Sequence, residues 1–300
     1  MGLAAGSSHY GVMRSIVIND FFVCIGAQKA GTTWLARMLQ THPDLFLTPV
    51  KEIHYFDHIR GITEHLSNRK RRSRYRKYHQ RMWTQWAQFG EYWRQWAWYR
   101  DYMKNPVNDE WYASLFRHRG AKRFAGEVTP EYAIIGKEGL GHLKTLAPDA
   151  RVLFIMRNPV TRAWSQVLHQ CRARGLDATR QSVDAIAAML AEPRARELGD
   201  YAATLADMAA VFRSDQMLLM FYEDMHKDRL AALEQVCRFI GCGYDPSYFK
   251  EVGRRFNRSQ DAALPDPVRA VLRDLYREQA EAVRQRMGRI PEAWAREFTA

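Results

Sequence analysis

Long hydrophobic segments are missing from this 300-residue chain. No stretch approaches the roughly eighteen consecutive apolar residues that a membrane-spanning helix needs. The first residues, MGLAAGSSHYGVMRS, also lack the apolar centre of a secretory signal peptide. The sequence therefore predicts neither a membrane anchor nor an export signal.

Cysteine is scarce, and its spacing excludes two common uses. The four cysteines, Cys24, Cys171, Cys237 and Cys242, form no C-x-x-C pair and no set with histidine at zinc-finger spacing. We therefore expect buried or partly buried free thiols in a reducing compartment.

Linker-like segments are absent as well. The chain contains no stretch rich in proline, glycine or serine and no internal repeat. Its composition, 47% hydrophobic and 26% charged, is that of a globular protein long enough to bury a large core. We predict a single domain over residues 16–300.

Acidic residues are outnumbered by basic ones. The chain has 45 lysines and arginines against 33 aspartates and glutamates, which gives a net charge of +12 and an isoelectric point near 9.7. This balance favours anionic partners, including nucleotides, acidic glycans, nucleic acid and membrane surfaces. It does not choose among them.

Apolar runs and helical periodicities alternate along most of the chain. The runs predict strands at 21–26, 151–157 and 215–224, with weaker candidates at 45–47 and 124–128. Helical patterns lie between and after them, at 32–40, 138–147, 161–174, 181–191, 201–213, 228–240 and 266–287. The alternation predicts an α/β fold with a central parallel sheet flanked by helices.

The segment at about 62–118 departs from this rhythm. A run at 69–81 carries eight lysines and arginines, and six of the nine tryptophans follow, at 83, 86, 93, 96, 98 and 111. We interpret the segment as a helical insertion between sheet elements. Its basic run is either a solvated helix face or part of a binding surface. Its aromatic residues either pack on the sheet or form a lid over an acceptor site.

The stretch CIGAQKAGTTWL resembles a phosphate-binding loop with a displaced lysine. Gly26 and Gly31 have the separation of the G-x-x-x-x-G-K-[ST] loop, but Lys29 lies between them and Thr32 occupies the usual lysine position. A predicted strand precedes the loop and a predicted helix follows it. Backbone N–H groups, a lysine and the hydroxyls of Thr32 and Thr33 would form an anion cradle. The alternative is a tight strand-to-helix turn without a ligand.

A second candidate anion site begins at Arg157, where another predicted strand ends. Pro159 is expected to start a helix that carries Ser165. An arginine fork and a hydroxyl near a helix start suit a phosphate group, although a structural ion pair would also explain the arginine. Ligands bind at the carboxyl ends of strands in open α/β sheets. Two such sites suit a nucleoside with phosphates at both ends.

These two motifs together resemble the sulfotransferase family, which uses 3′-phosphoadenosine-5′-phosphosulfate (PAPS) as donor and releases 3′-phosphoadenosine-5′-phosphate (PAP). Three further stretches are similar to motifs of that family: VKEIHYFD at 50–57, GEVTPEY at 126–132 and LMFYEDM at 219–225. The resemblance implies a P-loop-like sulfotransferase fold. It also implies sulfuryl transfer without a metal, because lysine would supply the positive charge.

The resemblance assigns roles to particular residues. Lys29 would stabilise the leaving phosphate, and Glu52, with His54 as rival, would be the catalytic base. Lys51 and Asp57 would contact the acceptor. The donor would be bound by Gly26, Gln28, Lys29, Ala30, Gly31, Thr32, Thr33, Trp34, Arg157, Ser165 and Tyr222.

Two departures from the family pattern leave assignments open. Val128 replaces a lysine of the E-K-T-P motif, and we expect Lys51 or Arg123 to supply the missing cation. The family's R-K-G segment is absent, and residues 254–258 are candidates to complete the site of the 3′-phosphate.

The acceptor is expected to be a hydroxyl or amine of a carbohydrate, a glycolipid or a related molecule, with its identity and sulfation position open. An NTP-dependent kinase of related fold and a basic nucleic-acid-binding protein are the alternatives, but the second leaves both anion motifs unexplained, so a nucleic-acid partner is not favoured. Peripheral contact with a membrane stays open, and the sequence does not indicate the oligomeric state. With no anchor, a cytoplasmic, bacterial location is expected.

Overall fold

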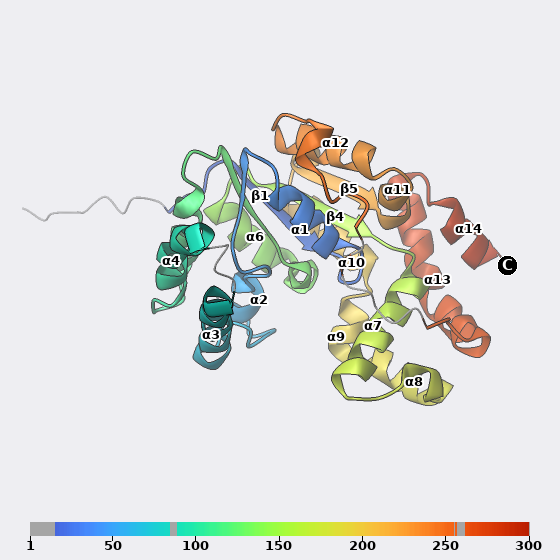
Figure 1. Ribbon diagram of the computed structural model, residues 1–300. Helices are drawn as coiled ribbons and strands as arrows, with labels where there is room; N and C mark the ends of the chain where they lie inside the picture. Colours follow the sequence, from blue (N-terminus) through green and yellow to red (C-terminus); the bar gives the residue numbers. More distant parts are fainter. Residues whose placement is uncertain (1–15, 85–88, 255, 257–261, 300) are drawn as a thin grey trace, which may run out of the picture.

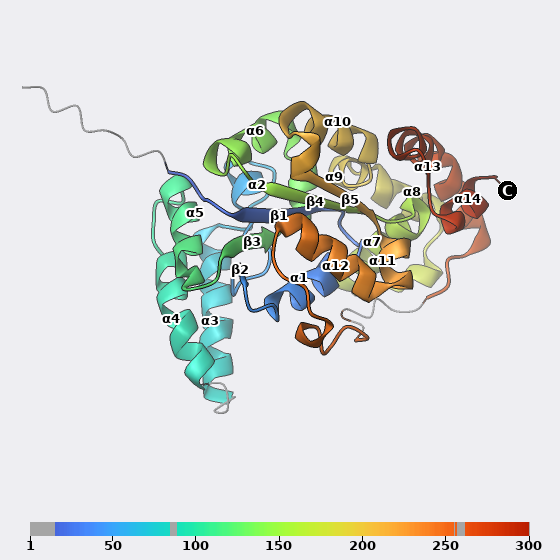
Figure 2. The same ribbon diagram turned by 90° about the horizontal axis from the view of Figure 1, so that it is seen from above.

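The computed structural model describes residues 16–84, 89–254, 256 and 262–299. Its centre is a sheet of parallel strands surrounded by helices (Figure 1). The sheet has five strands in the order β2-β3-β1-β4-β5, all of which are labelled in Figure 2. The strands are β1 (Phe21–Gly26), β2 (Leu45–Leu47), β3 (Phe124–Val128), β4 (Arg151–Met156) and β5 (Met217–Phe221). The predicted parallel α/β fold is confirmed.

The neighbouring strands β1 and β4 are apolar runs because helices cover both faces of the sheet. All six residues of β1 are buried, and β4 is buried from Val152 onward. The strand predicted at 215–224 is too long, because Tyr222 already begins a helix. The polar residues that follow it, Glu223 and Asp224, lie in that helix and not in the sheet.

Fourteen α-helices surround the sheet in the described part of the chain. They are α1 (Thr32–Gln40), α2 (Tyr55–Ile59), α3 (Asn68–Thr84), α4 (Phe89–Tyr102), α5 (Asp109–Phe116), α6 (Gly136–Leu146), α7 (Pro159–Ala173), α8 (Val183–Ala191), α9 (Pro193–Glu197), α10 (Tyr201–Val211), α11 (Tyr222–Lys227), α12 (Arg229–Ile240), α13 (Asp266–Met287) and α14 (Glu292–Thr299). Figure 2 shows α6 and α10 over one face of the sheet and α1, α11 and α12 over the other.

Helix α7 begins where the sequence predicts, at Pro159. The side chain of Asn158 caps it by accepting hydrogen bonds from the N–H groups of Val160 (3.0 Å) and Thr161 (3.3 Å). The cap satisfies two of the N–H groups that a helix start leaves without an intrahelical partner. It fixes the direction in which α7 leaves β4, and therefore the position of Ser165.

The predicted insertion comprises α3, α4 and α5, between β2 and β3, and α3 and α4 lie side by side beyond the β2 edge of the sheet (Figure 2). Trp98, Tyr102, Trp111 and Tyr112 are buried in the same hydrophobic cluster as the strands. These four aromatic residues therefore pack on the sheet and do not form a lid over an acceptor site. Trp93 and Trp96 are 58% and 37% exposed, while the side chains of Trp83 and Trp86 lie outside the described residues.

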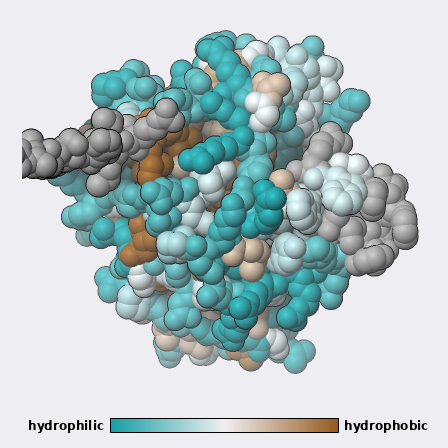
Figure 3. Space-filling model, turned by 90° about the vertical axis from the view of Figure 1, so that its left-hand side faces the viewer, coloured by the Kyte–Doolittle hydropathy of each residue, from teal (hydrophilic) through white to brown (hydrophobic). Residues whose placement is uncertain are grey.

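A buried arginine fixes α3 to the rest of the insertion. Arg71 is 1% exposed and donates hydrogen bonds to the carbonyl oxygens of Tyr102 and Lys104 and to the side chains of Asn68 and Asn105. The opposite face of the helix is strongly basic, and the end of the molecule that it occupies is largely hydrophilic (Figure 3). Within the described residues, no helix has the length and apolar composition needed to cross a bilayer.

Candidate active site

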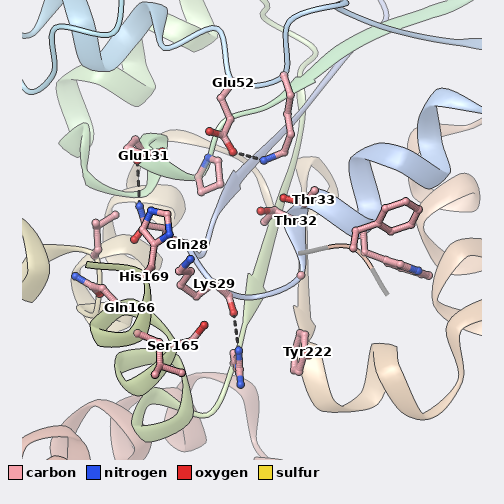
Figure 4. A pocket seen from close by; sticks show the side chains of 18 of the residues that line it. Gln28, Lys29, Thr32, Thr33, Glu52, Glu131, Ser165, Gln166, His169 and Tyr222 are labelled. Carbon is pink, nitrogen blue, oxygen red and sulfur yellow. Dashed lines mark hydrogen bonds and ion pairs between the residues drawn. The ribbon is translucent and has the colours of Figure 1, made fainter. Parts of the chain in front are cut away.

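A cavity of about 1180 Å³ opens at the carboxyl edge of the sheet. Residues that directly follow four of the strands line it: Gln28 after β1, Pro130 after β3, Arg157 after β4 and Tyr222 after β5. Parallel strands bring their carboxyl ends to one edge, which is why segments distant in sequence meet here. Figure 4 shows the labelled side chains converging on this space.

The loop after β1 is held in an unusual backbone conformation. Gly31 has φ 81° and Lys29 has φ 69°, both in the left-handed region. A Cβ on Gly31 would lie 2.9 Å from Met225 and 3.1 Å from the ring of Tyr222. Glycine is therefore required at position 31 both for its φ and for the close approach of α11.

The loop presents cationic and polar groups to the cavity. Gln28, Lys29, Thr32 and Thr33 all line it, and α1 begins at Thr32, so the helix N-terminus points the same way. Burial lowers the pKa of Lys29 to about 8, against the attraction of Glu52. An anion in the cavity would restore the full charge of this lysine. The predicted Gly26 and Ala30 are buried beneath the loop and shape it without lining the cavity.

Arg157 joins the two predicted anion sites. Its Nη1 donates to the carbonyl oxygen of Lys29 (3.0 Å), and its Nε donates to the hydroxyl of Thr161 (3.1 Å). Its guanidinium lies 4.8 Å from the centre of the Tyr222 ring. Ser165, one turn further along α7, is 7% exposed and also lines the cavity.

Two aromatic residues, Trp34 and Tyr222, line the cavity next to the phosphate loop. Trp34 lines it although it is only 4% exposed, and its indole N–H donates to the carbonyl oxygen of Val252 (3.1 Å). The guanidinium of Arg229 lies 5.9 Å from the Trp34 ring. The ring of Tyr222 lies 4.0 Å from that of His226, centre to centre, at an interplanar angle of 32°. Together they form an aromatic wall beside the phosphate loop.

Glu52 and His54 lie at the other end of the cavity, in a backbone conformation that the sequence did not suggest. The prediction placed both on one face of an extended segment, but their φ values are 63° and 64°. The turn still brings them together, with 3.8 Å between His54 Nε2 and Glu52 Oε2. Lys51 forms an ion pair with Glu52.

The charges of this pair are set by their neighbours. Burial opposes ionisation of Glu52, but hydrogen bonding to His54 and the charge of Lys51 lower its pKa to about 2. Burial likewise opposes protonation of His54, yet its bonds to Asp57 and Glu52 raise its pKa to about 9. At neutral pH the pair is therefore a carboxylate beside an imidazolium.

Asp57 lies behind His54 and does not line the cavity. It is fully buried in the first turn of α2, where it accepts hydrogen bonds from His54 Nδ1 (2.9 Å) and the hydroxyl of Thr63 (2.5 Å). Asp57 is therefore not in a position to contact an acceptor in the cavity, contrary to the expectation from the sequence. Asp57 instead orients the His54 ring so that Nε2 faces Glu52.

The segment that carries Glu52 and His54 is pinned to β3 by a buried carboxylate. Glu127 accepts hydrogen bonds from the N–H of Ile53 (3.2 Å) and from the hydroxyls of Tyr112 (2.5 Å), Thr129 (2.7 Å) and Tyr132 (2.9 Å). Its burial raises its pKa. Tyr112 belongs to α5, so one carboxylate connects the insertion, the sheet and the segment that carries Glu52 and His54.

Glu131 is a site residue that the sequence analysis did not single out. It accepts hydrogen bonds from Gln28 of the loop (3.1 Å) and from Arg194 of α9 (3.0 Å). Ligand atoms of Glu52, His54 and Glu131 lie within 4.8 Å of one another, a spacing suited to a metal ion. Glu52 is already paired with Lys51, and Glu131 with Arg194. These ion pairs make the three residues less suitable for binding a metal ion.

Further residues of the cavity come from parts of the chain with no recognisable motif. His65 lies against His54, with 4.1 Å between ring centres and an angle of 32° between the ring planes. Arg74, His169, Arg172 and Arg194 also line the cavity. They were missed because only the fold brings the loop before α3, helix α7 and helix α9 to one place. The one available signal was the basic run that contains Arg74.

The positions of the candidates narrow two assignments that the sequence left open: the cation expected in place of a lysine at position 128, and the residues at 254–258. Lys51 lines the cavity, whereas Arg123 does not and instead covers the ring of Phe124 at 4.9 Å. Val128 is buried in the core. Of the candidates at 254–258, Arg254 lines the cavity together with Phe256; Arg255 and Arg258 lie outside the described residues.

The structure thus has a cavity with cationic lining residues at the carboxyl edge of a parallel sheet. The model of the family described as "Sulfotransferase family" matches residues 21–246, so this chain belongs to the sulfotransferase family. Among curated proteins it is 24% identical over 226 residues to mouse heparan sulfate glucosamine 3-O-sulfotransferase 3B1, covering 73% of this chain and 45% of the relative.

A second relative is the human bifunctional heparan sulfate N-deacetylase/N-sulfotransferase 1. It is 24% identical over 307 residues, which covers 91% of this chain and 30% of the relative. The chain thus spans less than half of the length of these curated relatives.

Solved structures with the same fold include a sulfotransferase from Alicyclobacillus acidocaldarius. It has a TM-score of 0.63 at 21% identity and covers 93% of this chain and 100% of its own. The sulfotransferase domain of the Synechococcus PCC 7002 olefin synthase has a TM-score of 0.53 at 21% identity and covers 85% and 84% of the two chains. These likenesses support the P-loop-like sulfotransferase fold.

Proposed function

We propose that this protein transfers the sulfuryl group of PAPS to a hydroxyl or amine of a carbohydrate, glycolipid or related acceptor. The observation that carries the proposal is that the loop with Lys29 and the pair Arg157 and Ser165 line one cavity. The hydrogen bond from Arg157 to the Lys29 carbonyl oxygen places these groups side by side. This arrangement suits a nucleotide with two separate phosphate groups.

The donor would lie along the loop with its 5′-phosphosulfate at Lys29, Thr32 and Thr33. Its 3′-phosphate would lie at Arg157 and Ser165, with the adenine beside Trp34 and Tyr222. The N-terminus of α1 and the loop N–H groups favour negative charge at the first position. The forked guanidinium of Arg157 favours it at the second.

The acceptor would enter from the end that contains Glu52 and His54. Sulfuryl transfer forms a bond from the acceptor oxygen or nitrogen to sulfur and breaks the bond from sulfur to the 5′-phosphate oxygen. Lys29 would stabilise the charge that grows on that phosphate. Glu52, which is ionised at neutral pH, would accept the proton of the acceptor group.

His54 is the rival base, and its protonation supports the choice of Glu52. With a pKa of about 9, the imidazole already carries its proton at neutral pH and has no free site to accept another. It would instead hold Glu52 in place and favour its charge. Lys51 would share that task and supply a cation where the family lysine is replaced by Val128.

The acceptor end contains cations that suit an acidic or strongly polar acceptor. Arg74 and Arg194 line the cavity and interact electrostatically with His65, which lies against His54, and Arg74 belongs to the basic helix α3. The insertion would therefore form one wall of the acceptor site, although several of its described aromatic residues, such as Trp98 and Trp111, pack in the core. We also propose that residues 16–300 act as one domain, in the cytoplasm of a bacterium.

The test is turnover with a radiolabelled donor. The purified chain is incubated with sulfur-labelled PAPS and a panel of glycans, glycolipids and aryl hydroxyl compounds, and labelled products and PAP are counted. We expect acceptor-dependent PAP release that is lost in Lys29→Ala. Equal transfer by Lys29→Ala, or phosphate transfer from ATP in parallel reactions, would contradict the proposal.

A further inference from the structure

Cys237 and Cys242 form a pair of thiols outside the cavity just described. Cys237 lies in the last turn of α12 and is fully buried, while Cys242 follows the helix and is partly exposed. Their sulfur atoms lie within 4.8 Å of each other. We propose that this pair is a thiol–disulfide modification site, in which Cys242 reacts with a low-molecular-weight disulfide and Cys237 resolves the product.

The end of α12 places the two cysteines together. Gly241 has φ 87°, and the N–H groups of Gly241 and Cys242 both donate to the carbonyl oxygen of Cys237, at 2.8 and 3.0 Å. This is the hydrogen-bond pattern of a glycine-terminated helix, in which the residue two beyond the helix packs on the final turn. In most helices that contact is made by two apolar side chains; here it is made by two thiols.

The surroundings favour reaction at Cys242. Its thiol donates to the Cys237 carbonyl oxygen at 3.6 Å, and a hydrogen bond from the Cys237 thiol lowers the pKa of Cys242. A partly exposed thiol with thiolate character beside a buried second thiol is the arrangement of a redox-reactive pair.

A metal ion is the competing occupant, because His42, Cys237 and Cys242 lie within 4.8 Å of one another. The hydrogen bonds of His42 argue against it. Its Nδ1 accepts from the N–H of Asp44 (3.1 Å), so the proton is on Nε2, which donates to the Gly243 carbonyl oxygen (2.7 Å). Both nitrogens are in use, and coordination would break one of these bonds. Disulfide formation leaves both intact.

The reaction balances with a small disulfide as oxidant. The Cys242 thiolate attacks one sulfur of the oxidant, which forms a mixed disulfide and releases one small thiol. Cys237 then loses its proton and attacks the sulfur of Cys242, which releases the second small thiol and closes the protein disulfide. The two cysteines are oxidised, and the oxidant is reduced to two thiols.

A short segment of the chain connects the cysteine pair to residues that line the cavity. The segment from Gly243 to Val252 follows the pair, with Gly243 bonded to His42 at one end and Val252 bonded to Trp34 and Arg229 at the other. Trp34 and Arg229 line the cavity. A cross-link at Cys242 therefore restrains the start of the segment that supports the aromatic wall. The proposed modification does not depend on the proposed sulfuryl transfer.

The experiment treats the full chain with glutathione disulfide and follows free thiols, intact mass and peptide maps. We expect the wild type to fall from four free thiols to two, with a loss of two hydrogens and a linked Cys237–Cys242 peptide. Cys237→Ser should retain a glutathione adduct on Cys242, whereas Cys242→Ser should stay unmodified because Cys237 is buried. Cys171→Ser is the matched control and should also lose two free thiols, from three to one, with the same linked Cys237–Cys242 peptide.

Several outcomes would overturn the inference. Retention of four free thiols, or an adduct on wild-type Cys242 that never resolves, would show that the pair does not close. Stoichiometric Zn²⁺ binding that blocks oxidation would favour the metal site instead. The melting temperature of the oxidised wild type is a second measurement. We expect a small rise, because the bond restricts a short loop of the unfolded chain and joins residues that are already in contact in the fold; a fall would show that the fold does not accommodate the bond.

Discussion

The guanidinium of Arg157 is hydrogen-bonded to the carbonyl oxygen of Lys29 at 3.0 Å, although 128 positions separate the two residues. The bond joins the end of β4 to the loop after β1. It fixes the relative position of the two groups that would hold the two ends of the donor, and it gives Arg157 both a structural and a binding role.

Arg157→Ala should weaken PAP binding by about 100-fold, because it removes a charged partner of the 3′-phosphate and releases the loop. Titration calorimetry measures the effect. Arg180→Ala is the control, since Arg180 is an exposed arginine beyond the end of α7. PAP affinity within a factor of two of wild type in Arg157→Ala would show that this arginine does not contact the ligand.

Binding of PAP should take up protons near pH 8. Burial holds the pKa of Lys29 at about 8 in the free protein, so close to half of the molecules lack this charge at that pH. Bound phosphate raises the lysine pKa, and uptake of about half a proton is expected. Calorimetry in two buffers of different ionisation enthalpy measures the uptake, and Lys29→Met should abolish most of it. Uptake that persists in Lys29→Met would assign the proton to another group.

Glu52→Gln should lower kcat by about 100-fold or more while leaving the affinity for PAP within threefold of wild type. The substitution keeps the shape of the side chain but removes the basic oxygen. If kcat stays near the wild-type value, Glu52 is not the base. Loss of PAP binding would place Glu52 in the donor site and not at the acceptor.

His54 should stabilise the fold in a pH-dependent manner. Its pKa is raised to about 9 from an unfolded value near 6.5, so its stabilisation is fully present below about pH 6.5 and is lost as the pH rises through 9. The difference in unfolding free energy between wild type and His54→Asn should therefore shrink by roughly 3 kcal/mol between pH 6 and pH 10. Urea titrations at several pH values measure it; a difference that does not change with pH would mean that the pKa of His54 is the same in the folded and unfolded protein.

Arg71→Met should destabilise the protein by roughly 3 kcal/mol, because four oxygen atoms lose a buried donor. Arg72→Met, at the exposed neighbour, should change stability by less than about 0.5 kcal/mol. If the insertion is part of one cooperative domain, Arg71→Met shifts a single unfolding transition. A separate early transition for the insertion would argue for an independent unit.

Most of the sheet and the longer helices could be predicted from hydrophobic pattern alone. Helix α13 matches its predicted bounds because its apolar stripe has one clear period over 22 residues. The strand at β5 was overextended, since an apolar run does not show where Tyr222 turns into a helix. The fold class followed from the alternation of apolar strand segments with amphipathic helical segments, which is typical of a parallel sheet covered by helices.

Residues of the candidate site could be predicted where an anion-binding loop or a strand end requires a particular residue type. Residues that reach the cavity only through tertiary contacts could not. Gly31 and Arg157 stand out in the sequence because a loop and a strand end need those residue types. The left-handed backbone at His54 leaves no such mark, and neither does the burial of Asp57 behind it. His65 and Arg194 reach the cavity only through folding.

The most direct test of the account is the ratio of the dissociation constants for ADP and PAP, measured by calorimetry on the same preparation. The two ligands share adenosine and differ in where the second phosphate is attached. A site with separate 5′- and 3′-phosphate positions predicts that PAP binds at least about tenfold more tightly, or roughly 1.4 kcal/mol. Equal affinities, or tighter binding of ADP, would contradict the assignment of Arg157 and Ser165 to a 3′-phosphate and with it the proposed donor.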